Sequence, residues 1–212
     1  MLKRLGIIAF VLSLVGFAVL GYLEVTARVS QERMKSTWDG VENNHGGSGK
    51  DGAARRPGGT ADKGDKRKDE RVRQLAVEKR GSGRDQLGVL SIPKIGIEQV
   101  VLYGAAPKIL RRGPGLMKQT QYPGRIGNAV IAGHRTTYGF PFRRINELKN
   151  GDKIIFQNGS GRMVYKVKRT FRIQPDDRSV LKQTKKKTRL TLLSCDPPYR
   201  ATYRLIVVAE AS

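Results

Sequence analysis

Short apolar runs, frequent turn residues and the lack of βαβ spacing together indicate a small, mostly β barrel in the C-terminal part of this chain. The apolar runs have the length of strands, and Gly, Pro or Asn-Gly signals separate them. We expect three parts within the 212 residues: an anchor and juxtamembrane segment over 1–35, a tether over 36–86, and the folded domain over 87–212.

The N-terminal part has the features of a membrane anchor. Lys3 and Arg4 precede 19 uncharged residues, 5–23, which as a helix would be about 28 Å long, close to the thickness of a bilayer core. A cleaved signal peptide is the alternative, but its apolar core is normally shorter and no clear A-x-A site follows. We therefore expect an uncleaved single-pass anchor in the cell membrane, with a cytoplasmic N-terminus and an extracellular domain.

The expected tether separates the anchor from the domain. After a short helix over 24–35, residues 36–86 are rich in Gly and in charges of both signs and poor in large apolar side chains. Such a segment buries too little surface to offset its ordering entropy. His45 lies in this segment, so we expect it to be neither catalytic nor a ligand.

The domain predicts its elements in chain order. Two strands are expected within 87–104 around the Pro-Lys-Ile-Gly turn, with a core of Val89, Ile92, Ile95, Ile97, Val100 and Leu102. Further strands are expected over 127–133, 153–158, 163–173, 188–195 and 202–209, helices over 106–112 and 140–148, and a basic connector over 179–187. Alternation predicts one shared side for Met163, Tyr165, Val167, Phe171 and Ile173, with Arg169 the exception on that side.

The charge of the chain is concentrated in the domain. Residues 87–212 contain 24 Lys and Arg against 7 Asp and Glu, which is +17 of the total of +23. This excess favours polyanions such as nucleic acid, anionic lipid or cell-wall polymer, or it is a solvated surface. A single cysteine excludes an internal disulfide, and so few carboxylates predict no calcium site. We expect no metal and no cofactor.

Three polar residues at strand ends carry the candidate chemistry. Cys195 ends the run 188–195, His134 follows the strand 127–133, and Arg204 lies on the next strand after the cysteine. A thiolate favoured by His134 could attack a carbonyl, and the Arg204 fork could hold the developing oxyanion. No acidic residue near His134 completes a triad. On these residues alone, a small buried cysteine, a structural histidine and a solvated arginine remain the alternatives.

Three separated motifs strengthen the catalytic interpretation. Ala132-Gly133-His134-Arg135-Thr136, then Thr191-Leu192-Leu193-Ser194-Cys195, then Arg204 nine residues later, resemble the sortase family of membrane-anchored cysteine transpeptidases. The resemblance covers about 87–209. The pattern GHRTTYGFPF and Pro197 soon after the cysteine look most like the class E sortases of high-GC Gram-positive bacteria.

The resemblance implies a closed barrel of about eight strands, with His134, Cys195 and Arg204 as the catalytic set. It implies that Cys195 attacks the Thr-Gly bond of a C-terminal LPxTG-type signal on a secreted protein, with LAxTG favoured in class E. The thioacyl intermediate would then be resolved by an amine of a peptidoglycan precursor or of a pilin lysine. It also implies Ser194, Thr136 and Tyr138 as substrate-binding residues, although a structural turn role is the alternative for 136–138.

Two positions depart from the family pattern. Ser194 stands where the family usually has Thr, and it keeps the hydroxyl. Asp196 stands where class E members often have His, and an inward carboxylate would disfavour the thiolate. We expect Asp196 to point to solvent or to pair with a nearby arginine such as Arg200.

Three functions follow in order of preference. The first is a sortase that attaches surface proteins to the wall, and the second is a pilin-polymerising sortase. The third is a non-enzymatic, membrane-tethered basic module that binds polyanions. We expect no nucleic acid partner.

Overall fold

The computed structural model describes residues 15–16, 18–19, 21–22, 24–36 and 85–212. Most of the expected anchor and nearly all of the expected tether, residues 37–84, lie outside these ranges, so both stay predictions. Among the described residues, no helix combines the length and apolar character needed to cross a bilayer. The helix expected over 24–35 is present over 24–36.

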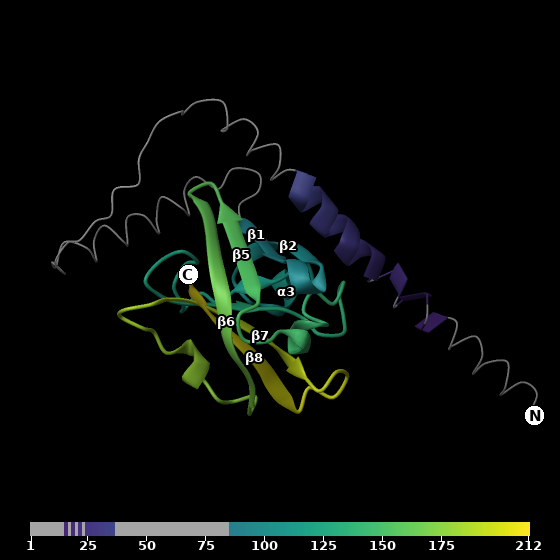
Figure 1. Cartoon of the computed structure of the whole chain (residues 1–212). Helices are drawn as coiled ribbons and strands as arrows, with labels where there is room; N and C mark the ends of the chain where they lie inside the picture. The colour runs from purple at the N-terminus through teal and green to yellow at the C-terminus, as the bar shows by residue number, and fades with distance from the viewer. Residues whose placement is uncertain (1–14, 17, 20, 23, 37–84) are drawn as a thin grey trace, which may run out of the picture.

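Eight strands of the described region close into one barrel, as expected, in the order β1-β2-β3-β4-β7-β8-β6-β5. The strands are β1 (Gln86–Ile92), β2 (Ile97–Tyr103), β3 (Gly115–Leu116), β4 (Gly127–Ala132), β5 (Lys153–Asn158), β6 (Gly161–Ile173), β7 (Thr188–Asp196) and β8 (Tyr203–Ala211). Pairing of β1 with β5 closes the barrel. The pairs β2–β3 and β4–β7 are parallel, and the others are antiparallel. Figure 1 shows β5 and β6 as a long hairpin next to β7 and β8.

The helical elements of the barrel domain are short. They are η1 (Pro93–Ile95), α3 (Pro107–Leu110), η2 (Ile145–Glu147) and η3 (Ser179–Leu181). The helix predicted over 140–148 is therefore wrong except for its last turn. Its apolar spacing arises because Phe142 must insert into the core, and the chain at Phe140 has a positive φ of 37° that a helix cannot accommodate.

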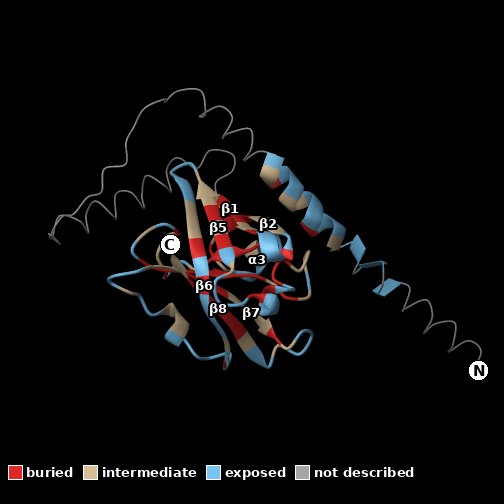
Figure 2. Cartoon of the chain, in the orientation of Figure 1, coloured by how far each residue is buried: buried red, intermediate tan, exposed pale blue. Residues whose placement is uncertain are grey.

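The main core fills the barrel, and Figure 2 shows the buried positions along the strands. It includes Leu90, Ile92, Val101, Leu192 and Leu205. The sequence-based core is partly corrected here. Val100 and Leu102 point away from this core, and they are buried because Met34 of the N-terminal helix (residues 24–36) packs on them.

A β-bulge corrects the predicted face of β6. The register between β6 and β8 shifts between Val167 and Arg169. Tyr165 and Val167 therefore face the main core, whereas Ile173 joins a second cluster on the outer surface, against which Phe171 packs. One extra residue in a strand reverses the alternation beyond it, so the predicted single side is wrong.

The N-terminal helix docks beside β2 and α3 (Figure 1). Gln31 donates from Nε2 to the Arg112 carbonyl at 2.6 Å and accepts from the Val100 amide at 3.0 Å. Lys35 pairs with Glu98 at 2.7 Å. These contacts place the helix next to the loop that follows β4.

Candidate active site

Cys195 and Arg204 lie opposite each other on neighbouring strands. They are direct partners in the antiparallel register of β7 and β8. Partners in such a pair extend their side chains to the same face of the sheet. Leu192 and Leu205 belong to the interior core, so alternation puts Cys195 and Arg204 on the outer face. Both residues are half-buried.

His134 completes a row with these two residues. β4 runs parallel to β7, with Ala132 opposite Leu193. The ladder continues because the Gly133 amide donates to the Leu193 carbonyl at 3.0 Å. His134 is the next residue, and this register places it beside the end of β7 that carries Cys195. The three residues therefore come from adjacent positions on β4, β7 and β8.

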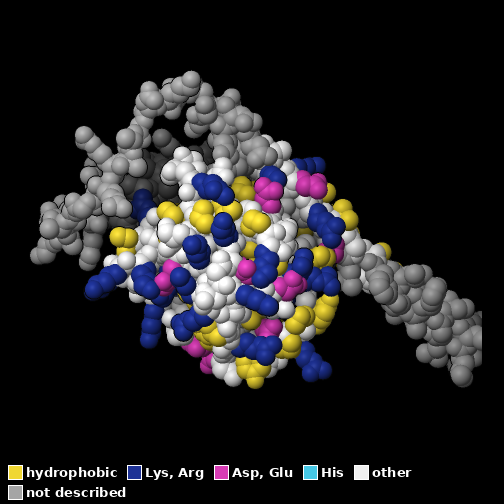
Figure 3. Space-filling view, viewed as in Figure 1, with side chains coloured by type: hydrophobic (Ala, Val, Ile, Leu, Met, Phe, Trp, Pro, Cys, Tyr) yellow, Lys and Arg dark blue, Asp and Glu magenta, His cyan; other side chains and the backbone are white. Residues whose placement is uncertain are grey.

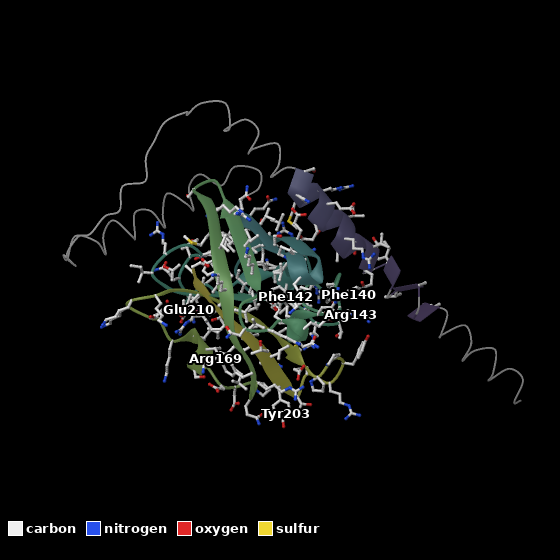
Figure 4. The ribbon with its side chains drawn as sticks, viewed as in Figure 1. Phe140, Phe142, Arg143, Arg169, Tyr203 and Glu210 are labelled. Carbon is white, nitrogen blue, oxygen red and sulfur yellow. The ribbon has the colours of Figure 1, made fainter. Side chains whose placement is uncertain are left out.

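A close contact fixes the path of the chain at His134. A Cβ atom added to Gly133 would lie 2.7 to 3.0 Å from atoms of the Phe142 ring. Phe142 is fully buried, and its amide donates to the His134 carbonyl at 3.0 Å. Figure 4 shows Phe142 within the fold and Phe140 beside Arg143 near the edge. The Gly-His pair therefore lets the chain pass over this ring.

The surroundings of His134 favour the neutral imidazole. Burial, and secondly the charge of Arg111, lower the pKa of His134 from its ordinary value of 6.5. The ring of Tyr138 lies 5.0 Å from that of His134 at a tilt of 48°. The Arg111 guanidinium lies 5.8 Å from the centre of the Tyr138 ring. At pH 7 the imidazole is thus able to accept a proton.

Arg204 is held by the loop between β7 and β8. Its Nη1 donates to the carbonyls of Ala201 at 3.0 Å and Tyr203 at 3.2 Å. Ala201 has a positive φ of 55°, so the loop turns its carbonyl toward the guanidinium in a conformation that is uncommon for alanine. The loop therefore fixes the orientation of Arg204 at the row.

The other predicted site residues have different surroundings. Ser194 is buried, and its hydroxyl donates to the Gly133 carbonyl at 2.8 Å. This bond links the strand of the cysteine to the strand of the histidine. Thr136 and Tyr138 are half-buried in the loop after β4. The roles of these three residues toward a substrate stay predictions.

An apolar surface adjoins the row on its outer face. The register places Ile173 of β6 opposite Arg204, and Phe171 opposite Ile206. Leu193 is in turn opposite Ile206. Val180 of η3 packs against the same cluster. An apolar side chain could therefore bind next to the thiol.

Sequence reasoning missed a buried ion pair beneath the row. Arg135 and Asp196 are each buried, and Arg135 Nη1 lies 2.8 Å from Asp196 Oδ1. The second oxygen of Asp196 pairs with Arg172. The expected solvent-facing carboxylate is therefore wrong, and its arginine partners are Arg135 and Arg172, whereas Arg200 is exposed.

The described residues contain no group of three or more His, Cys, Asp or Glu side chains arranged to hold a metal ion. The chemistry that the described site supports is therefore that of a thiol, an imidazole and a guanidinium. A half-buried cysteine beside a histidine and an arginine, on the outer face of a closed barrel, defines a site for acyl transfer through a thiol nucleophile.

Comparison with known proteins agrees with this class. A model described as the sortase domain matches residues 90–212. The chain belongs to the sortase family, whose members are cysteine transpeptidases.

Individual relatives are similar over part of their length. The chain is 34% identical over 110 residues to Sortase D of Bacillus subtilis, covering 52% of this chain and 54% of that protein. It is 33% identical over 135 residues to Sortase SrtE1 of Streptomyces coelicolor, covering 56% of this chain and 38% of that protein. The matches thus span about half or less of these relatives.

Solved structures share the barrel. Sortase C1 (SrtC1) from Streptococcus agalactiae superimposes with a TM-score of 0.61 at 26% identity, covering 67% of this chain and 76% of that one. Sortase E1 from Streptomyces coelicolor with tripeptide in the active site gives a TM-score of 0.56 at 29% identity, covering 60% and 88%. Class C and class E members are therefore both among the structural neighbours.

Proposed function

We propose that this chain is a cysteine transpeptidase that cleaves a C-terminal LPxTG- or LAxTG-type sorting signal between Thr and Gly and transfers the protein to a cell-wall amine. The observation that carries the proposal is the row of His134, Cys195 and Arg204 on adjacent strands. Membership of the sortase family gives this row its expected substrate class.

The first step joins the substrate to the enzyme. The Cys195 sulfur attacks the threonine carbonyl, and the neutral His134 accepts the thiol proton. Arg204 stabilises the oxyanion and aligns the signal backbone. The imidazolium then protonates the departing glycine nitrogen, so the Thr-Gly bond breaks and a thioester forms.

The second step releases the product. An amine attacks the thioester, and His134 takes the proton that this amine loses. The sulfur leaves as thiolate and regains its proton from the imidazolium, which restores the starting enzyme. The apolar surface of Leu193, Ile206 and Phe171 is suited to the leucine of the signal.

Two finer assignments belong to the same proposal. The similarity to SrtE1 at 33% identity favours a class E activity with an LAxTG signal. We also place the chain at the cell membrane, through the predicted anchor over residues 5–23, with the domain outside the cell. A pilin-polymerising sortase uses the same row and differs in the accepted amine, which would be a pilin lysine.

The test is thioester capture. The full chain is incubated with LAxTG and LPxTG peptides and then with a peptidoglycan-type amine or a lysine peptide. We expect a mass increase on Cys195 that the amine removes, with a faster reaction for LAxTG. Cys195→Ala should abolish both steps. Cleavage that persists in Cys195→Ala would contradict the proposal.

The same variant tests the non-enzymatic alternative. Lys and Arg side chains are spread over the face in Figure 3, and such a surface binds polyanions in a salt-dependent way. Under our proposal Cys195→Ala keeps any polyphosphate binding and loses peptide cleavage. A chain that binds polyphosphate but forms no thioester with either peptide would support the binding module instead.

A further inference from the structure

The buried pair of Arg135 and Asp196 occupies the inner side of the sheet, directly behind the reactive row. Their side chains are 4% and 3% exposed. Each is the next residue in sequence after a member of the row, since Arg135 follows His134 and Asp196 follows Cys195. The pair therefore joins the two backbone segments that carry the imidazole and the thiol.

Arg135 also bonds to three further acceptors. Its Nη1 donates to the Cys195 carbonyl at 3.2 Å, its Nε to the Arg143 carbonyl at 2.9 Å, and its Nη2 to Asn146 Oδ1 at 2.9 Å. One planar group thus ties the histidine loop to the strand of the cysteine and to the segment before η2. A lysine has a single ammonium and could not reach all these acceptors at once.

Charge around the thiol gives the pair a second consequence. The groups that face Cys195 from the neighbouring elements are His134 and Arg204, while Asp196 on its own strand carries the nearby negative charge. A carboxylate close to a thiol opposes the thiolate. Here that carboxylate points away from the thiol face and is paired with Arg135 and Arg172.

We propose that Arg135 is a positioning residue for the transfer reaction, with Asp196 as its counter-ion. Arg135 fixes the backbone of Cys195 relative to that of His134, and it compensates the carboxylate that would otherwise oppose the thiolate. This inference rests on the proposed function for its kinetic consequences, but its effect on the thiol can be measured without a substrate.

The experiment compares Arg135→Lys, Asp196→Asn and the double variant in the full chain. Arg144→Lys is the matched control, because Arg144 is an exposed arginine of the same loop paired only with Glu147 among its printed contacts. Three measurements are made: the rate of iodoacetamide alkylation of Cys195 against pH, kcat and KM with the LAxTG peptide, and the melting temperature.

The expected results separate positioning from simple stability. Arg135→Lys should lower kcat by about tenfold or more, with little change in KM, because the reacting groups are misaligned. It should also move the alkylation profile to higher pH. Asp196→Asn should move that profile to lower pH, and in the Arg135→Lys background it should reverse the upward shift. Arg144→Lys should match the wild type throughout.

Two outcomes would overturn the inference. One is a folded Arg135→Lys chain whose kcat and alkylation profile equal those of the wild type. The other is an Asp196→Asn chain with an unchanged alkylation profile, which decides the matter if Arg135→Lys does not fold. If no peptide is cleaved by the wild type but the alkylation profiles shift as expected, the sortase function fails and the positioning of the thiol stands.

Discussion

Replacing Gly133 by alanine tests the packing that holds His134 in place. The added Cβ would lie 2.7 Å from the nearest Phe142 ring atom, whereas ordinary contact begins at 3.4 Å. The ring or the backbone must therefore move by the difference, which is about 0.7 Å. Phe142 is fully buried, so the ring has no open space into which to move.

Two opposing effects set the size of the change. Over-packing of a full core costs roughly 1–3 kcal/mol. Gly133 has no positive φ, so alanine is conformationally allowed and restricts the unfolded chain, which stabilises by about 0.4–1 kcal/mol. Over-packing wins, and at about 4 °C per kcal/mol the melting temperature should fall by roughly 2–10 °C.

The assay combines thermal unfolding with thioester formation. Because His134 follows Gly133 directly, a displacement approaching 1 Å should also slow thioester formation by about tenfold or more. Gly159→Ala is the matched control: no atom lies within 4 Å of its added Cβ, and its φ is not positive. We expect Gly159→Ala to leave the melting temperature unchanged or slightly raised.

The reasoning is refuted if Gly133→Ala melts at or above the temperature of Gly159→Ala with full activity. A smaller loss of stability when Gly133→Ala is placed in a Phe142→Leu background would identify the ring as the clashing group. An equal loss in both backgrounds would mean that another contact is responsible.

Three further predictions follow from the described contacts. Arg111→Ala removes one of the causes that lower the pKa of His134, so this pKa should rise and the His134 proton resonance should titrate at higher pH; an unchanged titration contradicts the assignment. Tyr165→Phe deprives the Gly124 amide of its acceptor at 2.7 Å and should cost about 1–3 kcal/mol in urea unfolding, with a null effect counting against this bond. Arg204→Lys should keep the melting temperature but lower kcat by about tenfold or more, and full activity would argue against a role in oxyanion stabilisation.

Folding also couples His134 to stability, and the sign can be worked out. Its pKa is lower in the folded chain than the ordinary 6.5, so the unfolded chain binds the proton more readily. The contribution of this histidine to stability is therefore complete above pH 6.5 and is lost as the pH falls through the folded pKa. Unfolding measured at a series of pH values should show a smaller acid loss in Arg111→Ala.

Strand positions could largely be predicted from the sequence, because apolar runs and turn residues are local signals. Lys153–Asn158 was predicted at its observed bounds. The face of β6 could not, since the bulge between Val167 and Arg169 depends on pairing with β8. The helix over 140–148 failed because the place of Phe142 beneath Gly133 overrides local periodicity.

The reactive residues could be named from the sequence, but their alignment required the register. Cys195 opposite Arg204 follows from how β7 and β8 pair. Arg135 and Asp196 escaped notice because charged residues are normally exposed. Alternation offered a signal: if Cys195 and His134 face outward, the residue after each faces inward. Only the parallel pairing of β4 with β7 shows that the two then meet.

The parallel pairing of β4 with β7 means that no short fragment can carry the site. His134 and Cys195 are spatial neighbours, yet β5 and β6 lie between them in the chain, and these strands close the far side of the barrel. Contacts between distant segments form late and slowly in folding. The thiol should therefore gain its partners only when the whole ring of strands has assembled, which makes its reactivity a chemical signal of barrel closure.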